Sequence, residues 1–305
     1  MKRVTAKQAA RILPVVRADA NKYTRGVCEL VVGSERFAGA AVLAAKAANR
    51  MGAGYVKVYA CEQVAAALHI AQPSSVVLPA EEFSASSHEA RIARPHAVVA
   101  GCGMAGTEDE VRLVLDVLDK TKACVLVDGG GLAALACDEG IAVLRRRAAA
   151  GLPTVITPHG GEAARLARFV AKRCGSRVDD SCADAPRTAS DLARAFDAVC
   201  VLKGPDTFIA TGNEESPDDV ILMDRGTPAL SKAGTGDILA GAIGSLLAQG
   251  CDPADACVAG SFVHARAGVL ASRDIGEPCV TAEDVLDYLA PAIASLARKA
   301  RKEGN

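Results

Sequence analysis

The sequence predicts an α/β fold, with a mostly parallel central sheet, helices on both of its faces and a small antiparallel hairpin at one edge. Short β-branched runs alternate with longer alanine-rich runs of helical periodicity along most of the 305 residues. Such alternation is typical of strand–helix–strand units that build a parallel sheet. After residue 203 the alternation stops, and two short apolar runs flank a turn-rich segment, which predicts the hairpin.

The predicted elements follow in order along the chain. Buried strands are expected at the short β-branched runs, which cover residues 27–33, 55–59, 96–101, 123–128, 153–157 and 198–203. Helices are expected where apolar residues recur at helical spacing, over residues 39–51, 108–120, 161–170 and 238–248. Residues 207–210 and 220–223 form the predicted hairpin around the turn residues 212–217, and helices dominate the rest of the chain.

Two polar segments carry no predicted chemistry. Residues 173–187 are polar and contain proline, which predicts a surface loop too short to separate domains. The basic residues 298–302 predict a solvated last turn of helix, where cations complement the helix dipole. We therefore expect a single domain over residues 1–305.

The composition excludes several classes of partner. Hydrophobic residues make up 50% of the chain and charged residues 23%, as in a globular protein, and the formal net charge is −1. This charge gives no electrostatic attraction for nucleic acid or an anionic membrane. Aromatic residues are only 3%, which leaves few platforms for stacking bases, and no apolar run is long enough to span a membrane.

The cysteines predict a reducing environment. The 11 cysteines include no CxxC pair, and most lie in apolar runs, as Cys28, Cys102, Cys124, Cys200 and Cys257 do. We expect them to be small buried hydrophobic residues rather than catalytic thiols. Their odd number, and a start without a secretory signal, predict a cytoplasmic protein. The five histidines are too dispersed for a structural zinc site.

The segment Ser231-Lys232-Ala233-Gly234-Thr235-Gly236-Asp237 leads directly into a predicted helix. Small residues before a helix leave backbone N–H groups unpaired and aimed at one spot, where the helix dipole adds positive charge, so this segment predicts an anion site. Asp237 adds a carboxylate base, which suggests phosphoryl transfer to a hydroxyl. A tight turn with Asp237 as the helix cap explains the motif taken alone equally well.

Further polar and glycine-rich segments follow four of the predicted strands. They are residues 101–103, 128–131, 157–162 and 203–207. In open α/β sheets ligands collect outside the carboxyl ends of the strands, and glycine lets the backbone approach a ligand closely. Any one of these segments is compatible with ordinary turn chemistry, but their joint placement predicts a ligand site at this edge of the sheet.

The order of these motifs resembles the ADP-dependent NAD(P)H-hydrate dehydratases, a family within the ribokinase-like superfold. The resemblance covers nearly the whole chain and rests on residues 21–26, 33–34, 38–41, 52–56, 101–103, 128, 157–159, 201–204 and 234–237. Thr157-Pro158-His159 and Gly234-Thr235-Gly236-Asp237 are the most specific of these, because related sugar and vitamin kinases share the second motif but rarely the first.

The resemblance implies an activity in nicotinamide-nucleotide repair. Members of this family use ADP to phosphorylate the C6 hydroxyl of (6S)-NADHX or NADPHX; loss of phosphate then restores NADH or NADPH, and AMP is released. Asp237 is implied as the catalytic base, and Mg²⁺ is implied between the nucleotide phosphates. Implied partners are a separate NAD(P)H-hydrate epimerase and further copies of the chain in a homotetramer.

The resemblance also implies the residues that bind each ligand. The implied nucleotide contacts are Lys203, Gly204, Pro205, Asp206, Thr207, Gly234, Thr235 and Gly236. The implied substrate contacts are Ala40, Gly103, His159 and Asp237, and Glu162 is implied near a metal-bound water.

Three positions depart from the family pattern. Gly160 stands where proline is usual, and Gly130 and Ala133 replace polar residues, which predicts looser loops near the substrate.

Two other functions remain open from the sequence. A small-molecule kinase of the same superfold would phosphorylate the alcohol of a vitamin precursor without elimination, and Thr157-Pro158-His159 argues against it. A catalytically silent adenylate-binding protein would have no need of Asp237.

Overall fold

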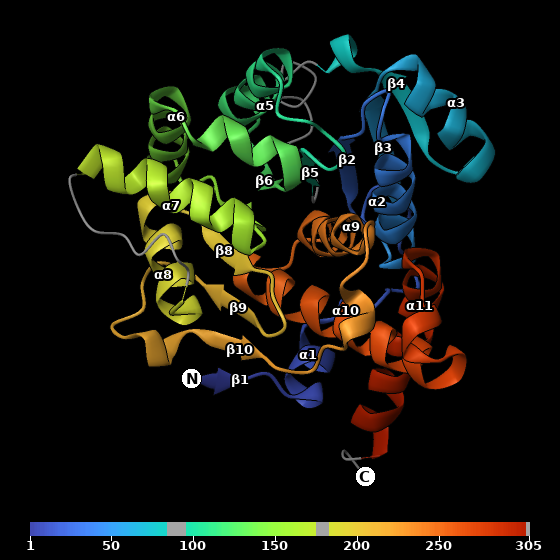
Figure 1. The fold of residues 1–305 in the computed structure, drawn as a ribbon. Helices are drawn as coiled ribbons and strands as arrows, with labels where there is room; N and C mark the ends of the chain where they lie inside the picture. The colour runs from blue at the N-terminus through green and yellow to red at the C-terminus, as the bar shows by residue number, and fades with distance from the viewer. Residues whose placement is uncertain (84–95, 175–182, 303–305) are drawn as a thin grey trace.

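The computed structural model describes residues 1–83, 96–174 and 183–302. Within these residues ten strands form one sheet in the order β1-β10-β9-β8-β7-β6-β5-β2-β3-β4 (Figure 1). The strands are β1 (Lys2–Arg3), β2 (Val27–Val31), β3 (Tyr55–Ala60), β4 (Val76–Pro79), β5 (His96–Ala100), β6 (Cys124–Val127), β7 (Thr154–Ile156), β8 (Val199–Leu202), β9 (Thr207–Ala210) and β10 (Ile221–Met223).

The sheet is parallel from β4 to β8, and β9 runs antiparallel to both of its neighbours. Ile209 on β9 pairs with Ile221 on β10, so the predicted hairpin is confirmed. β1 then adds to β10 in parallel and forms the edge. The predicted mostly parallel sheet with one antiparallel region is therefore confirmed.

Helices cover both faces of the sheet, as predicted (Figure 1). The helices that share a core with one face are α1 (Ala6–Ile12), α2 (Ala38–Arg50), α3 (Glu62–Ala71), α9 (Thr235–Ala248), α10 (Pro253–Ile275) and α11 (Ala282–Lys302). Those on the other face are α5 (Glu108–Lys120), α6 (Asp138–Ala149), α7 (Gly160–Cys174) and α8 (Ala185–Ala195). Short 3₁₀ segments lie at η1 (Ala80–Glu82), η2 (Gly129–Leu135), η3 (Pro217–Asp219), η4 (Pro228–Leu230) and η5 (Glu277–Cys279).

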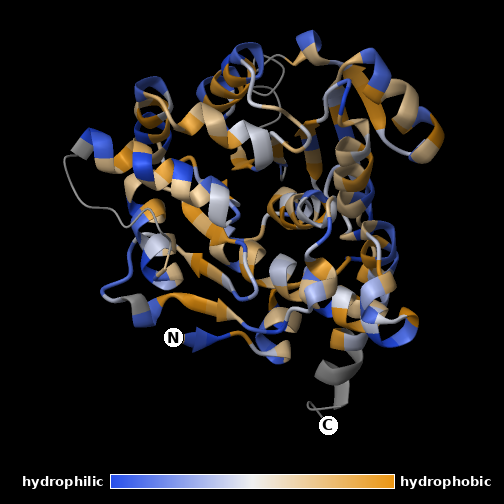
Figure 2. Cartoon of the chain, in the orientation of Figure 1, coloured by the Kyte–Doolittle hydropathy of each residue, from blue (hydrophilic) through white to orange (hydrophobic). Residues whose placement is uncertain are grey.

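The central strands β6, β7 and β8 are largely apolar on both sides because both faces of the sheet are buried there. On β6, Leu126 packs into the core on the α9 side, whereas its neighbours Val125 and Val127 pack into the core on the α5 side. Successive side chains of a strand point to opposite faces, so a central parallel strand needs an unbroken apolar run. Figure 2 shows this as strands in hydrophobic colours, surrounded by helices that also carry hydrophilic residues.

The predicted loop over residues 173–187 is shorter than expected. Helix α7 continues to Cys174, and α8 already begins at Ala185; residues 175–182 lie outside the described part of the chain. The Asp184 side chain accepts a hydrogen bond from the Arg187 N–H, which caps α8, and proline stands in the first turn. Proline fits a first helical turn because the N–H that it lacks has no partner there. Residues 298–302 are predicted as a helical turn, and the backbone of α11 is helical to Lys302.

The cysteine predictions are confirmed in part. The nine cysteines whose side chains are described are free, and Cys28, Cys102, Cys200 and Cys257 are buried. Cys124 is only partly buried and Cys279 is exposed.

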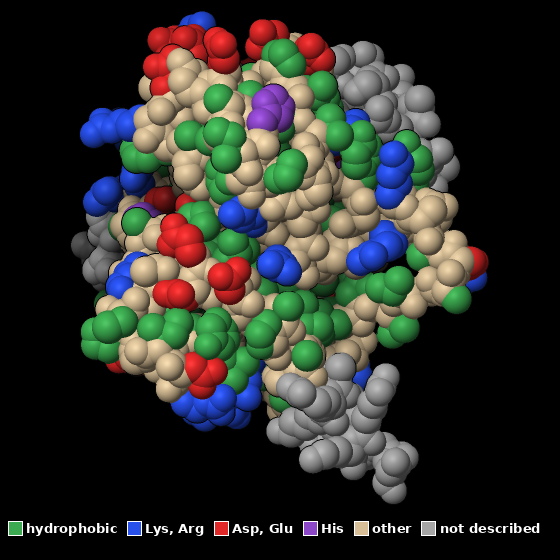
Figure 3. Space-filling view, turned by 90° about the vertical axis from the view of Figure 1, so that its right-hand side faces the viewer, with side chains coloured by type: hydrophobic (Ala, Val, Ile, Leu, Met, Phe, Trp, Pro, Cys, Tyr) green, Lys and Arg blue, Asp and Glu red, His purple; other side chains and the backbone are tan. Residues whose placement is uncertain are grey.

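The surface offers no continuous basic area on the face drawn in Figure 3, where Lys and Arg side chains are scattered among acidic and hydrophobic ones. None of the helices in the described residues is both long and apolar enough to cross a bilayer.

Small residues allow α2 and α9 to approach closely. A Cβ atom at Gly241 would lie 2.2 Å from the carbonyl oxygen of Ala44, and one at Gly244 would lie 2.2 Å from a methyl group of Val99. Ala44 and its neighbours on the same face of α2 are fully buried. This packing fixes where α9 begins, at the carboxyl edge of the sheet.

We predict that Gly241→Ala lowers the free energy of unfolding by roughly 3 kcal/mol, since a methyl group inserted against backbone forces the two helices apart. Chemical denaturation monitored by circular dichroism measures the change. Gly39→Ala, in α2 with open space around the new methyl, is the control and should leave stability unchanged or slightly higher. Equal stability of the two variants would contradict the close packing.

Candidate active site

A cavity of about 790 Å³ opens at the carboxyl ends of β6, β7 and β8. Asp128 follows β6, His159 and Glu162 follow β7, and Lys203 follows β8, and all of them line the cavity. The start of α9 and one side of α10 form the opposite wall. The edge of the sheet predicted from glycine-rich strand ends is therefore the edge that carries the cavity.

The first turn of α9 faces the cavity without a side-chain cap. Gly234 is the N-cap residue at φ +94°, a conformation that glycine adopts readily, and it is followed by Thr235, Gly236 and Asp237. The hydroxyl of Thr235 donates to the carbonyl oxygens of Leu230 and Lys232, so it holds the preceding loop together. The Thr235 N–H donates to the Lys232 carbonyl, and the Gly236 N–H, which faces the cavity beside Lys203, is left for an anion.

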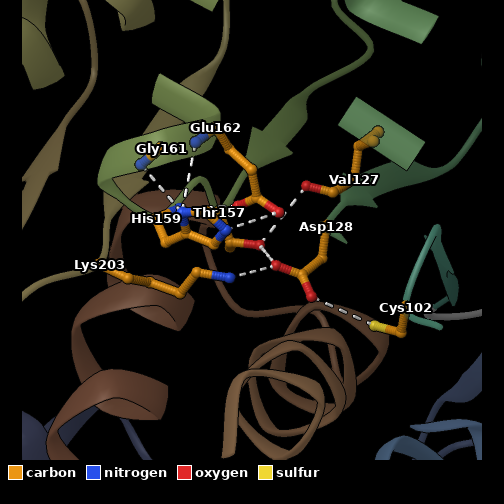
Figure 4. Close-up of polar contacts among 8 residues, drawn as sticks. All are labelled: Cys102, Val127, Asp128, Thr157, His159, Gly161, Glu162 and Lys203. Atoms are coloured by element: carbon orange, nitrogen blue, oxygen red, sulfur yellow. Dashed lines mark hydrogen bonds and ion pairs between the residues drawn. The ribbon is translucent and has the colours of Figure 1, made fainter. Parts of the chain in front are cut away.

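Asp128 is buried and receives three contacts (Figure 4). Lys203 Nζ and Thr157 Oγ1 each lie 2.6 Å from Asp128 Oδ1, and Cys102 Sγ lies 3.5 Å from Asp128 Oδ2. The Lys203 N–H also donates to the Pro158 carbonyl at 2.8 Å, which continues the β7–β8 pairing beyond the strands. The residues that follow β5, β7 and β8 are thereby joined to the carboxylate of Asp128, which follows β6.

The ammonium group of Lys203 keeps its charge inside the cavity. Burial lowers the pKa of Lys203, but the carboxylates of Asp128 and Glu162 outweigh burial, and the pKa is raised above its ordinary value. Lys203 is therefore a fixed positive charge beside the start of α9; a Cβ on Gly236 would lie 3.5 Å from its Nζ.

Asp237 holds its proton to unusually high pH for a carboxylic acid. Burial and the nearby charge of Asp128 raise its pKa to about 7, although Lys203 and a hydrogen bond from Cys102 act in the opposite direction. Side-chain atoms of Cys102, Asp128 and Asp237 all lie within 4.8 Å of one another. A carboxyl with this pKa exchanges its proton near neutral pH, which suits a general base.

His159 and Glu162 form a small network at the start of α7 (Figure 4). The backbone N–H of His159 donates to Glu162 Oε2 at 2.8 Å, and the ring Nε2 of His159 lies 3.4 Å from Glu162 Oε1. His159 Nδ1 accepts from the Gly161 N–H at 3.0 Å, so its Nε2 carries the proton in the neutral ring. More than half of the His159 side chain is exposed toward the cavity mouth.

Carboxylate oxygens, which come from three residues of the cavity lining, are the donors that a hard divalent cation prefers. Asp128, Asp237 and Glu162 supply them, although Asp128 is bonded to Lys203 and Glu162 to His159. This donor set fits a cation that completes its shell with water and phosphate oxygens.

Most of the predicted ligand contacts line the cavity, but three do not. Lys203, Gly204, Pro205 and Thr207 line it, whereas Asp206 is exposed outside the lining. Ala40 and Gly103 are outside the lining as well, although they meet each other: a Cβ at Gly103, at φ +67°, would lie 2.6 Å from the Ala40 Cβ. Gly103 follows Cys102 directly, so this pair adjoins the cluster around Asp128.

The loop after β6 is tighter than expected. A Cβ atom at Gly130 would lie 2.0 Å from the Met104 carbonyl oxygen, so only glycine fits without displacing the backbone. The prediction that Gly130 loosens this loop is wrong, because close backbone packing holds it. Gly160 has open space and begins α7, where the structure gives no crowding reason for its identity.

Sequence reasoning did not identify three residues in this region. Cys102 was expected to be only a buried hydrophobic residue, yet it contacts both acidic side chains. Ser261 and His264 of α10 line the cavity. Their one signal in the sequence is a pair of polar residues, one helical turn apart, within an apolar helix.

Comparison with known proteins gives matches over most of the chain. Residues 28–291 match the family model described as NAD(P)H-hydrate dehydratase. An ADP-dependent (S)-NAD(P)H-hydrate dehydratase of Xanthomonas campestris pv. campestris is 33% identical over 90% of each chain. A bifunctional NAD(P)H-hydrate repair enzyme of Thermofilum pendens is 35% identical over 93% of this chain. The chain spans only about half the length of such bifunctional relatives.

The fold is matched by solved structures. An ADP/ATP-dependent NAD(P)H-hydrate dehydratase from Bacillus subtilis, co-crystallized with ATP/Mg²⁺, superposes with a TM-score of 0.79 over 96% of this chain and 97% of that one, at 26% identity. A structure described as ribokinase-like shares the fold as well, which confirms the predicted fold class.

We predict that Asp237→Asn stabilises the protein above pH 7. The folded pKa of about 7 exceeds the ordinary value of 3.8, so wild-type stability falls as pH rises from about 4 to 7 and stays low above that. Asparagine carries no charge to bury. Melting temperatures should therefore differ by several degrees at pH 8 and converge near pH 4. The exposed Asp206→Asn is the control; if it matches Asp237→Asn at pH 8, burial of charge is not the cause.

Proposed function

Because the chain belongs to the NAD(P)H-hydrate dehydratase family, we propose that it repairs hydrated nicotinamide cofactors. It converts (6S)-NADHX or NADPHX to NADH or NADPH with ADP as phosphoryl donor, and releases AMP and phosphate. The observation that supports this most is Asp237, a carboxyl with a pKa of about 7 at the uncapped start of α9 beside Lys203. A base next to an anion site is what phosphorylation of an alcohol requires.

The first step is phosphorylation of the C6 hydroxyl. Asp237 accepts the hydroxyl proton while the C6 oxygen attacks the β-phosphorus of ADP, and the bond to the leaving AMP breaks. The N–H groups of the first turn of α9 and the ammonium of Lys203 stabilise the charge that develops on the transferred phosphoryl group. These groups are fixed in place, by Gly234 and by the Lys203–Asp128 contact, before the nucleotide arrives.

The second step is elimination. The C6–O bond breaks, inorganic phosphate leaves with the electron pair, and a proton is lost from C5, which restores the C5–C6 double bond. The residues that hold the phosphoryl group therefore also hold the leaving phosphate. His159 lies in the cavity lining, where backbone N–H groups bond its Nδ1 and Glu162 lies beside its Nε2, and its ring would contact the hydrate.

The contacts implied by the family complete the proposal. Lys203, Gly204, Pro205, Asp206 and Thr207, with Gly234, Thr235 and Gly236, bind the adenine nucleotide. Ala40, Gly103, His159 and Asp237 bind the hydrate. Mg²⁺ would neutralise the charge of the nucleotide phosphates, and Glu162 would hold it through a water molecule.

The setting of the protein is proposed from its relatives. Several relatives are named as bifunctional NAD(P)H-hydrate repair enzymes, and we propose that this chain works with a separate NAD(P)H-hydrate epimerase. We further propose a cytoplasmic homotetramer; sedimentation of the purified protein tests the assembly.

We predict stoichiometric formation of reduced nicotinamide and phosphate when purified protein is mixed with (6S)-NADHX, ADP and Mg²⁺. Absorbance of the reduced ring and a phosphate assay follow the two products. ADP should give a higher kcat/KM than ATP. A phosphorylated product that keeps its phosphate would favour the small-molecule kinase instead, and no turnover of either hydrate would refute the proposal.

We predict that kcat/KM rises with pH through an acidic limb near 7, because Asp237 must be ionised to accept the proton. Asp237→Asn should lower turnover by about 10²- to 10⁴-fold, remove this limb and leave ADP binding intact.

Gly236→Val, which places a branched side chain toward Lys203, should weaken ADP binding itself. Calorimetric titration of both variants with ADP separates loss of turnover from loss of nucleotide binding. Near-normal turnover of Asp237→Asn would show that Asp237 acts only as a helix cap.

A further inference from the structure

Two buried polar side chains in the cavity wall have no role in the proposed reaction. Ser261 and His264 lie on α10, and their exposed fractions are 4% and 7%. Ser261 Oγ and His264 Nε2 have no hydrogen-bond partner within residues 1–83, 96–174 and 183–302. Buried polar atoms in folded proteins are almost always bonded, so two such atoms in one cavity call for a partner that the cavity admits.

The cavity that holds this pair also has apolar side chains in its wall. Both side chains line the cavity together with Met223, Leu239 and Ala265. Met223 ends β10, Leu239 lies in the second turn of α9, and Ala265 follows His264 on α10. A flat ring system with a polar edge matches such a wall, because its faces contact apolar groups while its edge meets the hydroxyl and the imidazole.

The pair is unsuited to a phosphate. Burial lowers the pKa of His264 to about 4, so the imidazole is neutral at physiological pH, and Lys203 opposes a positive charge on it further. The cations and N–H groups that attract phosphate are instead Lys203 and the start of α9. The cavity therefore offers both an anion site and two neutral hydrogen-bonding side chains.

We propose that Ser261 and His264 recognise the base of the nucleotide, as an adenine. Between them, a hydroxyl and a neutral imidazole supply one acceptor for the exocyclic amine and one donor for an adjacent ring nitrogen. This inference rests on the proposed function, because it takes ADP as the nucleotide. It makes both residues determinants of donor specificity, with no part in the chemical step.

The test compares ADP with purine riboside 5′-diphosphate, which lacks only the exocyclic amine, by calorimetric titration. The wild type should bind ADP about 10-fold more tightly than the analogue. Ser261→Ala and His264→Phe should each weaken ADP binding by about 5- to 50-fold, and the double variant should bind both nucleotides equally. Binding of inorganic pyrophosphate, which has no base, should stay at the wild-type level in every variant.

Thr121→Val is the matched control. Thr121 is also buried with an unpartnered hydroxyl among the described residues, but it ends α5 and is not part of the cavity lining. This variant should keep the wild-type preference for ADP. Melting temperatures of all variants separate misfolding from lost contacts, and Ser261→Ala, the smallest change, still tests the inference if His264→Phe is unstable.

The outcomes distinguish this inference from the proposed function. The wild type could bind ADP and turn over the hydrate while the Ser261 and His264 variants still bind ADP more tightly than purine riboside 5′-diphosphate. Base recognition by Ser261 and His264 would then be wrong, and the proposed function would stand. If the wild type shows no preference for the amine, the inference is equally wrong. If the wild type does not bind ADP at all, both are refuted.

Discussion

The contact between the Lys203 ammonium and the Asp128 carboxylate, 2.6 Å apart, is the interaction on which the rest of the site depends. It joins the ends of β6 and β8 across β7 and places a positive charge beside the start of α9. One ammonium serves two acidic groups, however. Because Asp128 takes the direct contact, Asp237 remains close to a negative charge in a half-buried position, and its pKa rises to about 7. The ion pair thus sets the position of the Lys203 ammonium and contributes to the raised pKa of Asp237.

The frame around this ion pair is rigid because it is made of regular elements and close packing. Parallel strands bring Cys102, Asp128, Thr157 and Lys203 to one edge, and small residues on α2 and α9 bring the helix start to the same place. The Thr157 hydroxyl takes up a second lone pair of Asp128, so the carboxylate cannot turn away. Preorganisation of this kind lets fixed charges stabilise a transition state without reorganising when the substrate binds.

Several groups that are unfavourable for stability line this cavity. They are the uncapped start of α9, the half-buried Asp237, Ser261 Oγ and His264 Nε2. Outside the cavity, the buried Arg147 is fully bonded: it donates to four backbone carbonyl oxygens and to the Thr154 hydroxyl. Such a contrast is expected where binding rather than stability has shaped the residues.

The sequence by itself determined the fold class and the edge of the sheet that carries the site. Periodicity marks the buried strands and most helices because both faces of a parallel sheet are covered, and the glycines and polar residues after the strands mark the carboxyl edge. Local signals misjudged residues 173–187, since proline is compatible both with a loop and with the first turn of α8. They also misjudged Gly130, whose close approach to Met104 is invisible in the chain itself.

Only the tertiary structure decided which side chains act on one another. The pKa of Asp237 depends on Asp128, far earlier in the sequence, and on burial that no local pattern reports. Cys102 looks like an ordinary apolar residue until the strand ends bring it against two carboxyls. Ser261 and His264 look like polar interruptions of a helix until α10 packs beside α9. Electrostatic and hydrogen-bond partners are set by distance in space, which depends on the whole fold, whereas secondary structure follows from patterns that neighbouring residues already contain.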